Sequence, residues 1–179
     1  MTEKFIFKGH GVLAMLNNFI LAAAPLFFVI MMERFIDAGA PWTILALCAF
    51  FILQFPHQSY LFFEIKHLLN IDGIADELDF AGVAVFGGLS IFGLTLQVIT
   101  IIKIIALLNL TSLGLIVVLP LSFLAALGGC LGLTDLPFLP GFYPPLLIYH
   151  LKVFLNSQKL LAVCLGTTML LTLLCMVFI

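Results

Sequence analysis

The chain has 179 residues, of which 64% are hydrophobic and only 9% are charged, and its formal net charge at pH 7 is −2. A soluble globular domain carries roughly 25% charged residues, so this composition excludes that class and indicates an integral membrane protein. The sequence contains no run of Lys or Arg, so we expect neither a nucleic-acid partner nor a polybasic lipid-binding tail.

Five apolar stretches have the length of membrane-spanning helices, because a bilayer core of about 30 Å needs about 20 apolar residues per helix. We expect crossings at residues 12–32, 41–63, 80–102, 110–131 and 160–179. Pro41 opens the second stretch, where the first turn of a helix tolerates proline, and Pro120 predicts a kink in the fourth. Lys103 marks the turn between the third and fourth spans, because a lysine belongs near a membrane interface. Residues 1–179 then form a single transmembrane domain.

The stretch between the fourth and fifth spans is harder to assign. Four prolines exclude a regular helix over its first part: Pro137, Pro140, Pro144 and Pro145. The apolar part that follows is about half a bilayer long, so we expect a short re-entrant or interfacial segment at residues 143–155. The fold class is therefore all-α, a polytopic helical bundle with five transmembrane helices, and six are the alternative.

The distribution of basic residues favours five crossings with a cytoplasmic N-terminus. In that topology the cytoplasmic side holds five basic residues and the other side two, namely Lys4, Lys8, Lys66, Lys152 and Lys159 against Arg34 and Lys103. A sixth crossing moves Lys152 and Lys159 to the far side and reverses the bias. We expect a multi-pass protein of the bacterial inner membrane, with its polar loop, residues 64–79, in the cytoplasm.

Three pairs of small residues stand four positions apart, a spacing that lets helix backbones approach closely in lipid. The pairs are Ala84/Gly88, Ala125/Gly129 and Gly128/Gly132. We expect contacts within the bundle, with a homo-oligomer interface as the alternative. The other expected partners are membrane lipid and further membrane subunits.

A run of polar side chains, Gln54 to Tyr60, interrupts the second apolar stretch, and polar groups inside a span are functional candidates because lipid cannot solvate them. Asn17, Asn18 and Gln97 are candidate partners for these side chains. If the helix continues, His57 and Glu64 share a face, because they are seven residues apart. The candidate ligand-binding residues are Asn17, Asn18, Gln54, His57, Gln58, Tyr60, Glu64 and His67. We expect them to line a polar cavity that opens toward the cytoplasm.

The segment Asp72–Asp79 is acidic, and in a helix Asp72, Asp76 and Asp79 would share one face. Three carboxylates on one face suit a divalent ion, so these residues are the candidate metal ligands and Mg²⁺ the candidate cofactor. The alternative is structural: the same carboxylates cap the helix that follows.

The octapeptide Asp-Gly-Ile-Ala-Asp-Glu-Leu-Asp at 72–79 resembles the Asp-Gly-Leu-Ala-Asp motif of the cobalamin synthase family, membrane enzymes that join a nucleotide-activated corrinoid to a ribazole. The resemblance implies a part in metal-assisted transfer for Asp72, Asp76 and Asp79. It covers eight of the 179 residues, and the chain has no counterpart of the family's later Gly/Asp-rich segments. We therefore assign no family membership from it.

Two classes of function remain open. The first is a non-enzymatic membrane protein, either a small transport component or a subunit of a membrane complex, whose polar cavity binds a ligand or partner. The second is a membrane-embedded Mg²⁺-dependent enzyme that acts on a phosphorylated or lipid-linked substrate, with His57 or His67 as the acid or base. A haem held by His57 and His150 is a third alternative.

Overall fold

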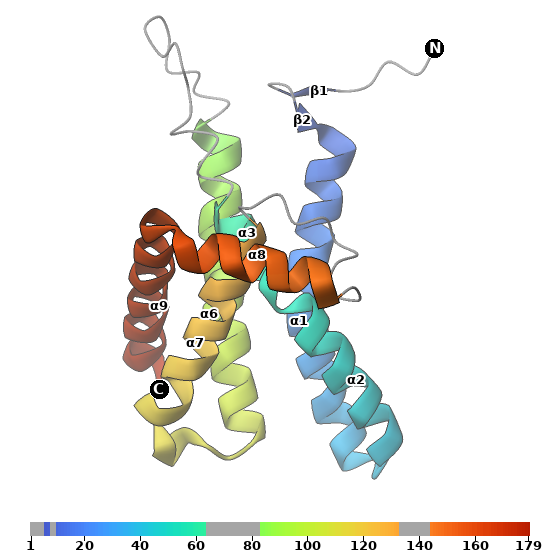
Figure 1. The fold of residues 1–179 in the computed structure, drawn as a ribbon. Coiled ribbons are helices and arrows are strands. Elements are labelled where there is room, and N and C mark those ends of the chain that lie inside the picture. The colour runs from blue at the N-terminus through green and yellow to red at the C-terminus, as the bar shows by residue number, and fades with distance from the viewer. Residues whose placement is uncertain (1–5, 8–9, 64–82, 133–143) are drawn as a thin grey trace, which may run out of the picture.

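The computed structural model describes residues 6–7, 10–63, 83–132 and 144–179 (Figure 1). The helices are α1 (Val12–Asp37), α2 (Pro41–Gln54), α3 (Pro56–Phe62), α6 (Gly88–Leu107), α7 (Leu115–Gly132), α8 (Pro144–Asn156) and α9 (Gln158–Phe178), with a π-helical turn η2 (Val83–Gly87) and a 3₁₀ turn η3 (Thr111–Leu113). A two-residue antiparallel pair, β1 (Ile6–Phe7) with β2 (His10–Gly11), precedes α1 and was not expected from the sequence. Apart from that pair, the expected helical bundle is confirmed.

In the part of the chain that the structure describes, three helical segments are long and apolar enough to cross a membrane: Leu16–Asp37, Ala84–Leu107 and Gln158–Phe178. Pro41–Gln54 and Leu115–Leu131 are apolar but shorter. The stretch expected as one span at 41–63 consists of two helices, because Pro56 has no N–H to donate to the preceding turn. The count of five or six crossings therefore stays a prediction.

The third span was expected to end before Lys103, but α6 continues to Leu107. The Lys103 ammonium lies 3.5 Å from the Glu33 carboxylate near the end of α1, and both side chains are substantially exposed. This ion pair offsets the free-energy cost of placing a charged lysine within the apolar helix α6. The chain turns only at Asn109, whose left-handed backbone (φ 54°) ends α6 and lets Leu110 N–H bond the Ile105 carbonyl.

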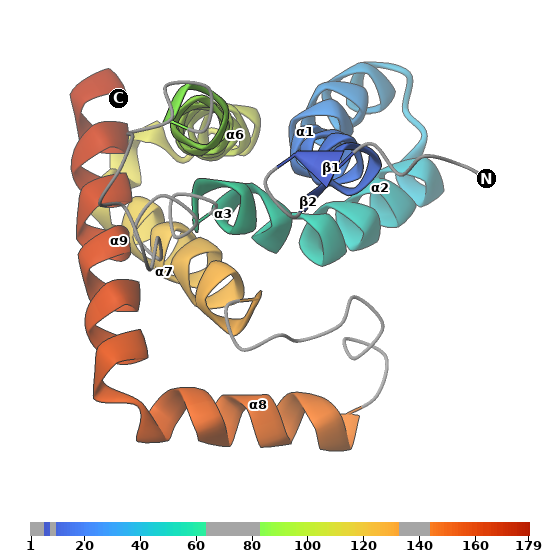
Figure 2. The same cartoon turned by 90° about the horizontal axis from the view of Figure 1, so that it is seen from above.

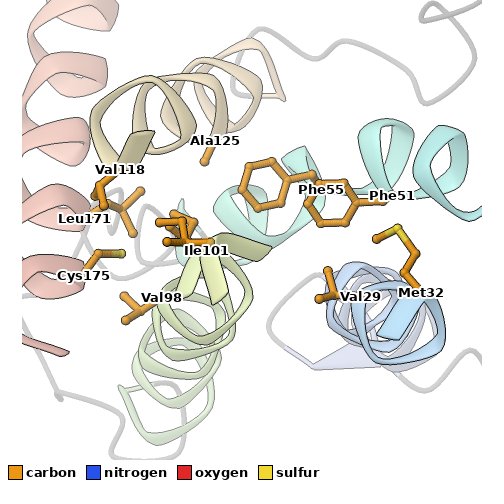
Figure 3. Close-up of a cluster of buried hydrophobic side chains, with 11 residues drawn as sticks. Val29, Met32, Phe51, Phe55, Val98, Ile101, Val118, Ala125, Leu171 and Cys175 are labelled. Carbon is orange, nitrogen blue, oxygen red and sulfur yellow. The ribbon is translucent and has the colours of Figure 1, made fainter. Parts of the chain in front are cut away.

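The main hydrophobic core joins α1, α2, α6, α7 and α9 (Figure 3). The rings of Phe51 and Phe55 are 5.1 Å apart and lie between Met32 of α1 and Ile101 of α6. Met32 also contacts Cys48 of α2, with 3.3 Å between the two sulfur atoms. The junction of α2 and α3 is thus packed on α1 and α6 through Phe51 and Phe55.

Helix α3 lies in the middle of the bundle, between α1, α6 and α7 (Figure 2). Two glycines make its close packing possible. A Cβ on Gly93 of α6 would lie 2.8 Å from the Phe62 amide nitrogen, and one on Gly129 of α7 would lie 2.5 Å from Ser59 Cβ. Gly129 therefore belongs to a contact within the bundle, whereas a Cβ on Gly88 would meet open space.

Helices α7 and α9 pack side by side in opposite directions. The thiols of Cys130, near the end of α7, and Cys164, near the start of α9, contact each other. Val118 of α7 packs with Leu171 of α9 in the main core (Figure 3). Helix α8 runs crosswise to α6 and joins α9 at a corner, where the Ser157 hydroxyl accepts a hydrogen bond from Leu160 N–H. The end of α7 and the start of α9 therefore lie at the same end of the bundle.

The surface of the bundle is apolar and part of its interior is polar. Large hydrophobic side chains on several helices are strongly exposed, among them Trp42 (81%), Ile116 (75%) and Val177 (77%). A soluble protein rarely exposes so much apolar surface, whereas lipid solvates it. This arrangement, with its three long apolar helices, is compatible with a membrane protein.

Candidate functional site

The polar interior is concentrated where α3 crosses α6. Gln58 and Ser59 of α3, and Gln97 and Thr100 of α6, all have 0% of their surface exposed. Gly93 lies one turn before Gln97 on the same face of α6, so α3 approaches closely enough for short side-chain bonds. A buried amide or hydroxyl without a hydrogen-bond partner destabilises the folded state. The hydrogen bonds of these four side chains therefore matter for the stability of the bundle.

Among the described side chains, two hydrogen bonds join the helices directly. The Gln58 amide Nε2 donates to Thr100 Oγ1 across 2.9 Å, and the Gln97 Nε2 donates to Ser59 Oγ across 2.5 Å. Thr100 in turn donates its hydroxyl hydrogen to the Leu96 carbonyl at 2.7 Å, so this hydroxyl both accepts and donates. Each glutamine thus uses its nitrogen to hold α3 on α6.

The amide oxygens of the same glutamines remain unused. Within the part of the chain that the structure describes, Oε1 of Gln54, Gln58 and Gln97 is buried and has no hydrogen-bond partner. Gln54 stands one turn before Gln58, and Phe55 between them keeps helical dihedral angles (φ −54°, ψ −39°). We call Gln54, Gln58 and Gln97 the amide cluster. It offers acceptors, so its chemical complement is a hydrogen-bond donor or a cation.

The structure brings only some of the predicted site residues together. Gln54 and Gln58 belong to the amide cluster, and Gln97, expected as a partner of this segment, bonds Ser59. Asn17 is exposed on α1, while Asn18 is half-buried and makes an interaction of its own. His57 and Tyr60 lie on α3, and the structure describes their backbone alone. The remaining predicted residues lie outside the described residues: Glu64, His67, Asp72, Asp76 and Asp79.

The sequence reading missed Thr100 and the role of Gly93. A signal for both was present, because Gly93, Gln97 and Thr100 follow each other at steps of four and three residues and therefore share a helix face. A glycine on the polar face of an apolar helix indicates close approach of another backbone. Ser59 lies within the predicted polar run but was not singled out.

The described ranges contain no group of three or more His, Cys, Asp or Glu side chains that could hold a metal ion. The carboxylates proposed as Mg²⁺ ligands lie in the range 64–82, which the structure does not describe. His150 is buried on α8 with its ring edge-on to Tyr149. The four cysteines are free thiols, of which Cys130, Cys164 and Cys175 are buried and Cys48 is half-buried.

No protein-family model matches the chain, and neither a curated protein nor a solved structure matches it.

Proposed function

We propose that the chain is a multi-pass protein of the bacterial inner membrane that acts as a small transport component or as a subunit of a membrane complex. Its polar site, on the cytoplasmic side, binds a ligand or partner at the amide cluster. The exposed apolar side chains and the buried glutamines support this placement in lipid. The observation that carries the binding role is the set of three buried amide oxygens that have no partner among the described residues.

The arrangement of the helices supports five crossings. Because α9 starts where α7 ends and runs back along it, α8 does not take the chain to the opposite end of the bundle. With 13 residues at about 1.5 Å each, α8 is also too short for a bilayer core of about 30 Å. In this topology α1, α6 and α9 run outward and α2 and α7 run inward.

The basic residues fit the same orientation. Arg34 and Lys103 stand near the ends of α1 and α6, which share one end of the bundle. Lys152 and Lys159 stand on α8 and at the start of α9, toward the opposite end. Since cytoplasmic segments carry the excess of Lys and Arg, we propose that the latter end, with the N-terminus, faces the cytoplasm.

Native mass spectrometry of protein gently extracted from its own membrane tests the binding role. We compare the wild type with Gln97→Met, which keeps the side-chain volume and removes the amide, and with Thr95→Val, which removes an exposed hydroxyl from the same helix. The proposal predicts a stoichiometric small-molecule or subunit adduct on the wild type and on Thr95→Val, and its loss from Gln97→Met. Bare polypeptide in all three samples contradicts the proposal.

A further inference from the structure

The crosswise helix α8 lies at the level where other helices of the bundle end or begin. One buried cluster joins Phe63, which follows α3, Cys130 near the end of α7, Cys164 near the start of α9, and Phe154 of α8. Figure 2 shows α8 along one side of the bundle, with its outer side turned away from the other helices. Because apolar helices end where hydrocarbon gives way to lipid headgroups, this level corresponds to a membrane boundary.

The outer face of α8 carries a row of polar side chains. Tyr149, Lys152 and Asn156 are three and four residues apart, so they share one face of the helix, and all three are exposed. Lys152 lies nearly opposite Phe154, because two residues turn an α-helix by about 200°. Since Phe154 is buried against the bundle, Lys152 projects away from it.

Neither water nor hydrocarbon alone suits this face. Ile148 and Leu155 are strongly exposed on the same side of α8 as Lys152, and water solvates such apolar side chains poorly. Hydrocarbon solvates them well but strongly disfavours a lysine. The headgroup layer accommodates both, because the lysine stem lies among apolar groups while its ammonium reaches the phosphates. Tyr149 fits the same depth, since tyrosine is enriched at membrane interfaces.

We propose that α8 lies in the headgroup layer and that Lys152, together with Lys159, binds the phosphates of anionic phospholipids. Lys159 is exposed in the first turn of α9, which begins at the same level. This inference goes beyond the proposed function, because it uses the placement in a membrane but not the binding role of the amide cluster. Helix α8 then anchors the bundle to charged lipid as an amphipathic interfacial helix.

The depth of α8 in a bilayer tests the first part of the inference. The chain has a single tryptophan, Trp42, so Tyr149→Trp combined with Trp42→Phe places the sole tryptophan near the middle of α8. The full chain is reconstituted into phosphatidylcholine vesicles whose acyl chains carry bromine, a quencher of tryptophan fluorescence, either close to the headgroup or close to the chain end. We expect the bromine close to the headgroup to quench more strongly.

Lipid binding tests the second part. Native mass spectrometry measures the binding of phosphatidylglycerol, which is anionic, and of phosphatidylcholine, which is zwitterionic, to the full chain in a neutral detergent. We expect the wild type to prefer phosphatidylglycerol, and Lys152→Gln and Lys159→Gln each to weaken its binding about fivefold. Phosphatidylcholine binding stays unchanged. Arg34→Gln, which removes an exposed positive charge near the end of α1, is the matched control and retains the wild-type preference.

Equal binding of the two lipids, or a preference that both lysine variants retain, overturns the inference. So does a loss of Tm in Lys152→Gln that is the same in vesicles with and without phosphatidylglycerol, because the lysine then pairs with a carboxylate of the chain itself. Absence of quenching places α8 in water and overturns the inference alone. Stronger quenching by the deep bromine places α8 within the hydrocarbon and also contradicts the five-crossing topology. The adduct test with Gln97→Met is independent of all these results.

Discussion

Gln97 of α6 and Ser59 of α3 are joined by a 2.5 Å hydrogen bond although 38 residues separate them in the sequence and neither side chain has any exposed surface. In lipid such a bond joins helices that gain little from apolar contact alone, because the lipid tails are as apolar as the side chains. The bond therefore contributes to the specific position of α3.

A double-mutant cycle measures this bond. We expect Gln97→Met and Ser59→Ala each to lower the free energy of unfolding, with a coupling energy of about 1 kcal/mol between them. The matched cycle uses Thr95→Val with Ser59→Ala and gives no coupling, since Thr95 is exposed and bonds its own helix. Additive losses in the first cycle, measured by reversible unfolding in mixed micelles, would show that the two side chains do not interact.

Gly129 of α7 leaves no room for a side chain. Because a Cβ there would lie 2.5 Å from Ser59 Cβ and 2.6 Å from Phe63 Cε2, Gly129→Ala displaces α3 and destabilises the protein by about 2 kcal/mol. Gly88→Ala places the same methyl group in open space, so we expect no loss of stability. Thermal unfolding compares the two variants, and equal Tm values for them would refute the close contact between α3 and α7.

The ion pair between Glu33 and Lys103 reports where the membrane ends. Both side chains are substantially exposed, and if water surrounds them their pairing contributes less than about 1 kcal/mol. Glu33→Gln then changes the free energy of unfolding by less than that amount. High salt lowers the free energy of unfolding of the wild type by a similarly small amount. A loss of several kcal/mol would instead place this pair inside the hydrocarbon region.

The native thiols of Cys130 and Cys164 test the direction of α9. Since the thiols contact each other between α7 and α9, a mild thiol oxidant in membranes produces an intramolecular disulfide, visible as a mobility shift that a reductant reverses. Cys164→Ala abolishes the shift, and Cys175→Ala leaves it unchanged because Cys175 lies near the opposite end of α9. A shift that survives Cys164→Ala would contradict the antiparallel packing.

The sequence predicted the helical fold class and the polar run on the second apolar stretch, because hydropathy is a local property that does not depend on packing. The division of that stretch at Pro56 was not predicted, although the proline is visible: whether such a residue bends a span or ends it depends on the neighbours of α3. The helix α6 extends through Lys103 for a related reason, since its partner Glu33 is 70 residues away.

The candidate site was predicted in part. Gln54, Gln58 and Gln97 were found from residue type, because amides are conspicuous inside an apolar stretch. Thr100 and Gly93 were not, because a threonine or a glycine is common in membrane helices and gains meaning only from its position on the face of α6 that meets α3. The candidate acidic ligands, Asp72, Asp76 and Asp79, lie outside the described residues and stay a prediction.

The sidedness of two loops tests the five-crossing account most directly. Ser112 precedes α7 and Asn156 ends α8, and both are exposed, so each accepts a cysteine without loss of packing. A membrane-impermeant thiol reagent is applied to sealed vesicles of known orientation, with the wild type as the background for its buried or half-buried thiols. We predict that Ser112→Cys and Asn156→Cys are labelled from opposite sides of the membrane. Labelling of both from the same side would mean that α8 crosses, and would contradict the account.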